Sequence, residues 1–315
     1  MIVTVTPNPA LDVTYEVDKL QLGGEHRVRA VHERPGGKGI NVARILSSLG
    51  HRTLATGLTI GATGRAMTAA LQEFDVPEAF LQLDDSGRGH TRRTVVVHDG
   101  LATTSFYEPG PRLIAADAKA LIEHVRALVG GATALVISGS LPPGLPDDTV
   151  ARLASLAHDH GIPAVVDTAV MLALAAKTGA VLNPNRAELA IAVGVPDLPT
   201  LTDVVEAARH LVSEGANALV VTLGSEGMVA VTKDAVLRSR PPTVLSGNPT
   251  GAGDACAAAL TARLATACAA GKAVDWHATL VEATALSAAA LLRPVAGEVD
   301  REAYERWKTE IEITA

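Results

Sequence analysis

The sequence predicts an α/β fold in which helices cover both faces of a mostly parallel central sheet, with a small antiparallel sheet added to it. Two observations predict this fold. In the second half of the chain, short runs of β-branched and apolar residues alternate with longer segments of helical periodicity. In the first half, two regions contain strand-like runs joined by turn residues, with no helix between them. Continuous apolar strands that alternate with helices are typical of a parallel sheet buried on both sides.

The first strand is predicted in "MIVTVTPNPALD", which lacks the basic flank of a signal peptide. Four further strand-like segments with turn signals follow, at 12–20, 26–34, 90–100 and 101–109. We expect them to form an antiparallel lid from residues 12–34 and 90–108, inserted in a single domain that spans residues 1–315. One face of this lid can close over a site, while its other apolar face needs cover.

The later strands each end in Gly, Ser, Asn or Asp: "ALVISGS" (134–140), "PAVVDTA" (163–169), "GAVLNPN" (179–185) and "ALVVTLG" (218–224). Helices are predicted between them, at 147–161 and 201–215, each with Asp or Thr near its start and Gly at its end. Ligands of such sheets bind beyond the carboxyl ends of the strands. We therefore expect the site at these polar strand ends.

Composition excludes several classes of protein. The net charge of −7 argues against a general nucleic-acid binder, and no apolar run approaches the ~20 residues of a membrane span. Apolar residues make up 48% of the chain and aromatic residues 3%, which predicts a large core of Ala, Val and Leu. Cys256 and Cys268 have no disulfide or metal-site spacing, so we expect both to be small buried side chains of a cytoplasmic protein.

A glycine turn opens the apolar helix in "NPTGAGDACAAAL" (248–260). The amides from Gly251 to Asp254, together with the helix dipole, form an anion site. The stretch is not a P-loop, and Cys256 stands where a dinucleotide fingerprint needs its third glycine, which excludes a nicotinamide oxidoreductase. The carboxylate of Asp254 has two interpretations: a helix cap, or the base that takes a proton from an attacking hydroxyl in phosphoryl transfer.

Three other segments carry polar groups at loop positions: "RPGGKGINVARILSSLG" (34–50), "SGSLPPG" (138–144) and "TLGSEG" (222–227). A fourth, "NPNRAE" (183–188), places Asn185 and Glu188 three residues apart on one face of a helix start. That pair suits a hydrated Mg²⁺ ion, but taken alone it favours an ordinary capping box.

In their order and spacing, these motifs resemble the PfkB/ribokinase family of carbohydrate kinases over nearly the whole chain. The resemblance is closest to the branch that phosphorylates hexose phosphates, 1-phosphofructokinase and tagatose-6-phosphate kinase. It implies a ribokinase-like three-layer α/β/α sandwich, ATP and Mg²⁺ as cofactors, and a homodimer joined through the lid. The implied reaction is phosphorylation of fructose 1-phosphate at its 6-hydroxyl to give fructose 1,6-bisphosphate. Tagatose 6-phosphate or fructose 6-phosphate are the alternative acceptors, and a sugar-phosphate-binding regulator without catalysis is the alternative of another class.

The resemblance also implies a role for individual residues. It makes Asp254 the catalytic base, with Gly251, Ala252 and Gly253 as the anion hole. The implied substrate residues are Asp12, Gly36, Gly37 and Asn41 for sugar hydroxyls, Lys38 and Arg92 for the substrate phosphate, and Ser138, with Arg27 as a further candidate from the lid. The implied nucleotide residues are Thr222, Gly224, Ser225 and Gly227, and Asn185 and Glu188 would organise Mg²⁺.

Three segments depart from the family pattern. "DTAV" (167–170) stands in place of DTSG or DSSG, Asn183 stands where a lysine commonly precedes Pro-Asn, and "LLRPVAGEV" (291–299) lacks the usual Asn and Gly-Thr near the adenine and monovalent-cation sites. The adenine contacts and a potassium requirement therefore stay open. Positive charge gathers in or beside the inserted segments, where a sugar phosphate would be attracted: Arg27, Arg29, Arg34, Lys38, Arg88, Arg92 and Arg93.

Overall fold

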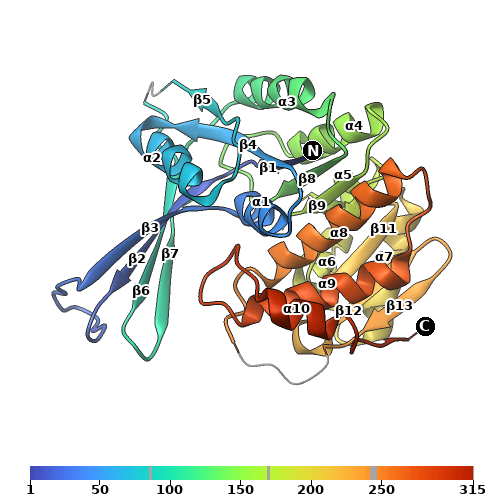
Figure 1. The fold of residues 1–315 in the computed structure, drawn as a ribbon. Coiled ribbons are helices and arrows are strands. Elements are labelled where there is room, and N and C mark those ends of the chain that lie inside the picture. The colour runs from blue at the N-terminus through green and yellow to red at the C-terminus, as the bar shows by residue number, and fades with distance from the viewer. Residues whose placement is uncertain (85–86, 169–170, 242–246, 315) are drawn as a thin grey trace.

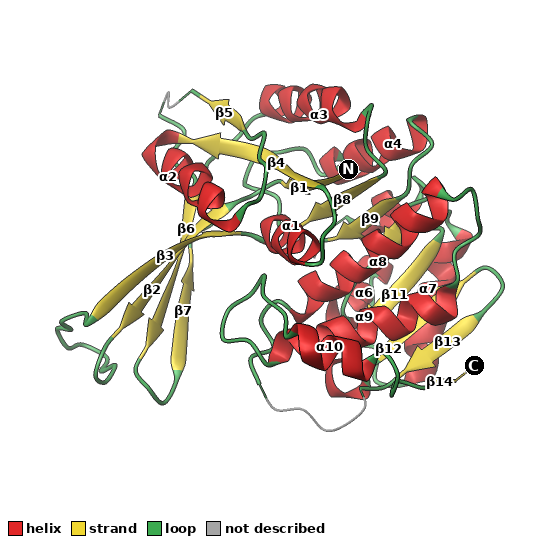
Figure 2. Ribbon diagram, viewed as in Figure 1, coloured by secondary structure: helices red, strands yellow, loops and turns green. Residues whose placement is uncertain are grey.

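A computed structural model describes residues 1–84, 87–168, 171–241 and 247–314 of the protein. A central sheet lies between two layers of helices, and a separate four-stranded sheet projects from one end of the molecule (Figure 1, Figure 2). The three-layer α/β architecture with an added small sheet is thus confirmed.

The central sheet has the strand order β14-β13-β12-β11-β10-β9-β8-β1-β4-β5 in the described chain. Its strands are β1 (Ile2–Thr6), β4 (Thr53–Ile60), β5 (Leu81–Leu83), β8 (Ala134–Ser138), β9 (Ala164–Asp167), β10 (Val181–Leu182), β11 (Ala218–Thr222), β12 (Met228–Thr232), β13 (Val236–Ser239) and β14 (Ile313–Thr314). Neighbouring strands from β5 to β11 are parallel, whereas β12, β13 and β14 add an antiparallel edge.

Helices cover both faces of this sheet. They are α1 (Lys38–Ser48), α2 (Gly61–Leu71), α3 (Ala115–Val129), α4 (Thr149–Asp159), α5 (Leu172–Ala176), α6 (Arg186–Val193), α7 (Leu201–Ser213), α8 (Ala252–Ala269), α9 (Trp276–Leu291) and α10 (Arg301–Trp307), with short 3₁₀ turns η1 (Gln72–Phe74) and η2 (Gly224–Glu226). Helices α3 to α7 share one apolar core with the sheet. Helices α1, α8, α9 and α10 share the other core, which is built largely from alanine.

Alanine in α8 and α9 lets these two helices pack closely on the sheet, because its side chain is small and costs no rotamer entropy in a helix. Cys256 is buried in this packing, as predicted. Cys268 is exposed, so the prediction that it is buried is wrong. It lies in the last turn of α8, beyond the part of that helix that the sheet covers.

The small sheet, which we call the lid, has the strand order β3-β2-β6-β7. Its strands are β2 (Ala10–Glu16), β3 (Ala30–Gly36), β6 (Arg92–His98) and β7 (Thr103–Tyr107). Each predicted hairpin is antiparallel, but β2 and β6 pair in parallel. This follows from connectivity, because each hairpin leaves the body along its first strand and both therefore point outward (Figure 1).

Helix α2 packs against the base of the lid, under β2 and β3. A small apolar cluster there joins Leu11 and Val13 of β2 to Met67 and Leu71 of α2. The outer part of the lid has no such cover, and every residue of β7 is exposed. No helix in the described segments is both long and apolar enough to pass through a membrane.

Candidate active site

The carboxyl ends of the parallel strands bring polar residues to one edge of the central sheet. Strand β8 ends at Ser138, β9 at Asp167 and β11 at Thr222, while Asn183 directly follows β10. All four ends lie at the same edge because these strands are parallel. This is the edge at which sheets of this kind bind their ligands.

Asp254 lies in the first turn of α8 and is almost fully buried, with 4% of its surface exposed. One of its carboxylate oxygens accepts a 2.8 Å hydrogen bond from Nδ2 of Asn41 in α1. Burial raises the pKa of Asp254 to about 7, and the nearby carboxylate of Asp167 adds to that rise. The N-cap position of α8 belongs to Gly251, so the helix-cap interpretation of Asp254 is not needed.

The glycine turn before α8 lies tight against another segment of the chain. Gly251 has a φ of +92°, and a Cβ atom there would lie 2.9 Å from Cα of Ala296. Both the backbone angle and the lack of space require glycine. The turn therefore opens α8 at a fixed place, where the first amides of the helix have no acceptor within the helix and favour an anion.

Lys38, the first residue of α1, lies among acids. Its Nζ atom is 3.1 Å from Oδ1 of Asp167 and 3.8 Å from Oε1 of Glu188. Burial disfavours the ammonium charge, but the carboxylates of Asp167, Glu188 and Asp254 outweigh it, so the pKa of Lys38 is raised. Lys38 therefore stays protonated, and its charge acts both on the predicted base, Asp254, and on the predicted metal residue Glu188. Asp167 is fixed on its other oxygen by the hydroxyl of Ser138, which donates at 2.8 Å.

Asn185 and Glu188 form a capping box at the start of α6. The Glu188 amide donates to Oδ1 of Asn185, and the Asn185 amide donates to Oε2 of Glu188, both at 2.9 Å. No group of three or more acidic, His or Cys residues in the described chain is arranged to hold a metal by itself. The arrangement still fits Mg²⁺, which proteins commonly bind through one or two carboxylates plus substrate phosphates and water.

A second polar group lies at the base of the lid. Asp12 of β2 packs directly against Gly36, where a Cβ atom would overlap its carboxylate. Burial raises the pKa of Asp12, against the opposing effects of the Thr94 hydrogen bond and the Arg92 charge. Arg92 of β6 donates from Nε to the main-chain oxygen of Asn8 at 3.1 Å, which fixes the plane of its guanidinium group. Gly37, with a φ of +112°, is the N-cap of α1.

Of the other predicted basic residues, several are paired with side chains of the protein itself. Arg29 contacts Asp18, Arg34 contacts Glu298, and Arg88 contacts Asp117. Arg27 is exposed in the turn between β2 and β3. Lys38 and Arg92 are thus the two predicted phosphate residues that lie beside other predicted site residues.

The four predicted nucleotide residues lie together at the carboxyl end of β11. Gly224 and Ser225 lie in η2, Gly227 directly follows it, and Thr222 is the last residue of β11. The Thr222 amide donates to the carbonyl of Pro184 at 3.0 Å, so this loop lies beside the start of α6. A Cβ atom on Gly227 would collide with the carbonyl of Ser239, which explains glycine there.

Sequence reasoning did not assign a role to several residues that the fold brings to the site. Asp167 appeared only within a motif that departs from the family, and Ala169 and Val170 of that motif lie outside the described residues. Asn183 donates to the carbonyl of Gly253 at 3.4 Å and accepts from Sγ of Cys256. Asn8 donates to Pro109 and Ser140. The signal that could have found Asp167 and Asn183 was their position directly at strand ends.

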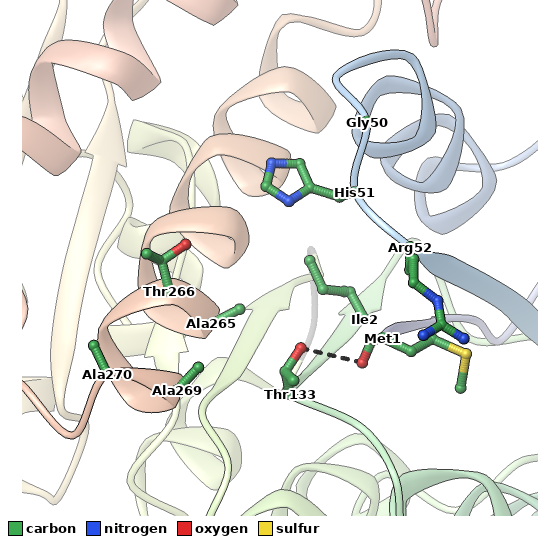
Figure 3. A pocket seen from close by; sticks show the side chains of 10 residues that line it. All are labelled: Met1, Ile2, Gly50, His51, Arg52, Thr133, Ala265, Thr266, Ala269 and Ala270. Carbon is green, nitrogen blue, oxygen red and sulfur yellow. Dashed lines mark hydrogen bonds between the residues drawn. The ribbon is translucent and has the colours of Figure 1, made fainter.

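Two of the molecule's cavities lie away from these residues. One of about 530 Å³ opens at the amino ends of the strands, the edge opposite to the site, between the start of β1 and the last turns of α8 (Figure 3). His51 and Arg52 form part of its wall, and Ala265 and Ala269 form another. Another cavity, of about 810 Å³, lies beside the end of α7 and the β12–β13 turn. Neither includes a predicted site residue.

The chain is similar to proteins of known family and fold. The model of the pfkB family of carbohydrate kinases matches residues 7–300. Phosphofructokinase-2 from Escherichia coli, in a crystal structure with potassium, is 31% identical with a TM-score of 0.88, and 98% of each chain is covered. A possible 1-phosphofructokinase from Thermotoga maritima is 25% identical with a TM-score of 0.84, covering 100% of this chain and 99% of that one. Ribokinase from Arabidopsis thaliana, complexed with ribose and ATP, is 21% identical with a TM-score of 0.74 over 98% of each chain, which confirms a ribokinase-like fold.

Proposed function

Because the chain belongs to the pfkB family of carbohydrate kinases, we propose that it transfers the γ-phosphoryl group of ATP to the 6-hydroxyl of fructose 1-phosphate. The product is fructose 1,6-bisphosphate. The protein is a sugar phosphate kinase, a phosphotransferase with an alcohol group as acceptor. Fructose 1-phosphate is our first choice because the ordered motifs resemble those of 1-phosphofructokinase, and the T. maritima relative carries that description.

The observation that carries the proposal is the buried carboxylate of Asp254 at the glycine turn. A general base works best when its pKa lies near the working pH, and burial gives Asp254 a pKa of about 7. In the proposed step, Asp254 accepts the proton of the attacking hydroxyl. The new P–O bond forms at the sugar oxygen, the bond to the β-phosphate breaks, and ADP leaves. The amides of Ala252, Gly253 and Asp254 stabilise the charge on the transferred group.

Lys38 is proposed to bind phosphate charge beside the base. Its ammonium group lies next to Asp167 and Glu188, which favours the phosphoryl group in transit over the phosphate that stays on the sugar. Arg92 is proposed to anchor that second phosphate, because its fixed guanidinium lies at the lid beside Asp12. Asp12 and Asn41 are proposed to orient sugar hydroxyls, with Ser138 acting through Asp167.

When bound, Mg²⁺ would neutralise charge on the nucleotide phosphates, with Glu188 and Asn185 as its nearest protein groups. The loop from Thr222 to Gly227 is proposed to line the nucleotide site. Potassium is a further candidate, because the E. coli relative was solved in complex with it. The segment 291–299 departs from the family pattern where that ion is expected, so potassium is a variable of the assay below.

Fructose 6-phosphate is the second candidate acceptor, because the 31% identical E. coli protein has been solved in complex with that sugar phosphate. An assay of ADP release, with fructose 1-phosphate, fructose 6-phosphate and tagatose 6-phosphate compared with and without potassium, decides between them. We expect the highest kcat/KM with fructose 1-phosphate. A preference for another sugar would overturn the acceptor, and no ADP release with any of the three would leave a sugar-phosphate-binding regulator.

A further inference from the structure

Glu298 lies between two arginines that come from different parts of the molecule. One of its oxygens, Oε1, accepts hydrogen bonds from Nη1 of Arg34 at 3.0 Å and from Nη2 of Arg44 at 3.3 Å. Arg34 belongs to lid strand β3, and Arg44 belongs to α1 in the body. Glu298 itself lies in the loop between α9 and α10, which extends toward the lid in Figure 1.

Of the two arginines, Arg44 is the fixed one. Its side chain is 6% exposed, its Nη1 donates to the carbonyl of Ala296 at 3.0 Å, and its guanidinium group lies 4.3 Å from the ring centre of Phe74. The side chain of Arg34 is 38% exposed. Among the described residues, its ion pair is with Glu298. Glu298 therefore ties a lid strand to a rigid point of the body.

The loop that carries Glu298 also packs on the glycine turn. A Cβ atom on Gly251 would lie 2.9 Å from Cα of Ala296, and one on Gly297 would lie 3.1 Å from Oδ1 of Asn41. Nδ2 of Asn248 donates to the carbonyl of Pro294 at 2.9 Å. Asn41 in turn holds the carboxylate of Asp254. The loop thus contacts the turn before α8 and the residue that orients the base.

Arg34 also lies opposite a residue of the proposed sugar site. It pairs across the strands with Asp12 in the register of β2 and β3, and two residues after it Gly36 packs against the Asp12 carboxylate. A movement of β3 that accompanies sugar binding at Asp12 would therefore move Arg34, and through Glu298 it would bias the position of the loop on the glycine turn.

We propose that Glu298 is a positioning residue that couples the lid to the glycine turn, so that a sugar phosphate bound at the lid strengthens nucleotide binding at the turn. This rests on the proposed function for the identity of the two ligands. Coupling between binding sites is reciprocal, so the nucleotide strengthens sugar binding by the same factor. Removing the Glu298 charge leaves Arg34 and Arg44 facing each other, which separates the lid strand from the loop.

The test is equilibrium binding of a non-hydrolysable ATP analogue with Mg²⁺, titrated with and without a saturating hexose phosphate. We expect the sugar phosphate to tighten nucleotide binding at least about five-fold in the wild-type protein, and by less than about two-fold in Glu298→Gln. Arg34→Gln should lose the same coupling, and the double variant should lose no more than either single variant, because the two residues act as one unit. Glu282→Gln is the matched control, since it removes a carboxylate that pairs with Arg263 between α8 and α9, away from the lid.

A Glu298→Gln variant that keeps the wild-type coupling would overturn the proposal, as would an equal loss in Glu282→Gln or a wild-type protein without coupling. Hydrogen exchange without ligand separates this from failure of the proposed function. Glu298→Gln should speed exchange both in residues 30–36 and in residues 248–254, whereas Glu282→Gln should change neither. If the wild-type protein phosphorylates none of the three sugars, the proposed function fails, but hydrogen exchange still decides whether Glu298 joins the two segments. Unchanged exchange in either segment of Glu298→Gln would show that Glu298 does not join them.

Discussion

Asp254 is a carboxylic acid kept almost entirely from solvent, and its burial has opposite effects on activity and stability. Asp254→Asn should lower kcat by about 10²–10⁴, because it removes the proposed base while leaving an amide oxygen for Asn41. The same change should raise the melting temperature at pH 8. Burial raises the pKa of Asp254 to about 7 in the folded protein, so the stability present below the usual aspartate pKa is lost as pH rises through about 7.

Melting curves of both proteins at pH 5 and pH 8 check this prediction. At pH 8 the wild-type carboxylate is ionised, and removing that cost should raise Tm by about 2 °C or more. At pH 5 the folded wild type is already protonated, so the gain should be smaller. A variant with near wild-type kcat would contradict the role of Asp254. So would a variant whose gain in Tm over wild type is smaller at pH 8 than at pH 5.

The two proposed phosphate residues should separate in their kinetics. Lys38→Met should lower kcat much more than it raises the KM for sugar phosphate, because the ammonium lies beside Asp167 and the proposed metal residue Glu188 and acts on the charge of the proposed base, Asp254. Arg92→Met should mainly raise the KM for sugar phosphate, since a charge-assisted contact in the ground state is lost. Initial rates over a matrix of both substrates give the split. If Lys38→Met raises only the KM for sugar phosphate, Lys38 instead binds the phosphate that the sugar carries.

For single residues, the sequence predicted which side chains belong to the site better than it predicted which of them touch one another. The motif order pointed to Asp254, Asn41 and Lys38. In the fold, Asn41 donates a hydrogen bond to Asp254, and the Lys38 charge acts on Asp254 through space. It did not predict that Lys38 lies among three carboxylates, because Asp167 and Glu188 are more than a hundred residues away in the chain. Glu298 has no sequence signal at all, since an acid in a loop is ordinary until its two arginine partners are placed beside it.

At the scale of elements, the junction of β3 and α1 sets the shape of the sugar side. A Cβ atom on Gly36 would overlap the carboxylate of Asp12. Gly36→Ala should therefore displace Asp12 and raise the KM for sugar phosphate at least about ten-fold, while the KM for ATP changes little. Gly131→Ala is the control, because a Cβ atom there meets nothing within 4 Å. Equal KM values in wild type and Gly36→Ala would exclude the predicted role of Asp12.

Local sequence patterns predicted which segments are strands and helices, but they did not predict which strands pair with each other. Apolar runs that end in polar residues predicted β8, β9, β10 and β11, because period and flanking residues are local signals. The parallel pairing of β2 with β6 was not predicted, since it joins strands about eighty residues apart. At the start of α6 both interpretations of Asn185 and Glu188 survive, because a capping box is fully satisfied within the chain and leaves Oε1 of Glu188 facing Lys38.

For the whole molecule, the site depends on segments from both ends of the chain. Strands β2 and β3 and helix α1 from the first fifty residues meet α8 and the loop before α10 from the last seventy. Contacts such as Asn41 with Asp254 and Arg34 with Glu298 join these regions. Neither end of the chain can form the site alone, so the positions of the lid and of the glycine turn depend on each other. The outer part of the lid stays uncovered.

The exposed face of the lid leads to the last prediction, a homodimer joined through residues 12–34 and 90–108. On the face of the sheet away from Asp12, Val31 is 55% exposed and Phe106 57%. Tyr15 on the same face is half-buried against the cluster that joins β2 to α2, so the uncovered part is the outer one. A small sheet with an uncovered apolar face is marginal in water unless another surface packs on it. Light scattering should give twice the chain mass at micromolar concentration, Phe106→Glu should give the monomer, and Ile191→Glu, at an exposed apolar residue of α6, should stay dimeric. A monomeric wild type, or dissociation of both variants alike, would rule out the lid as the interface.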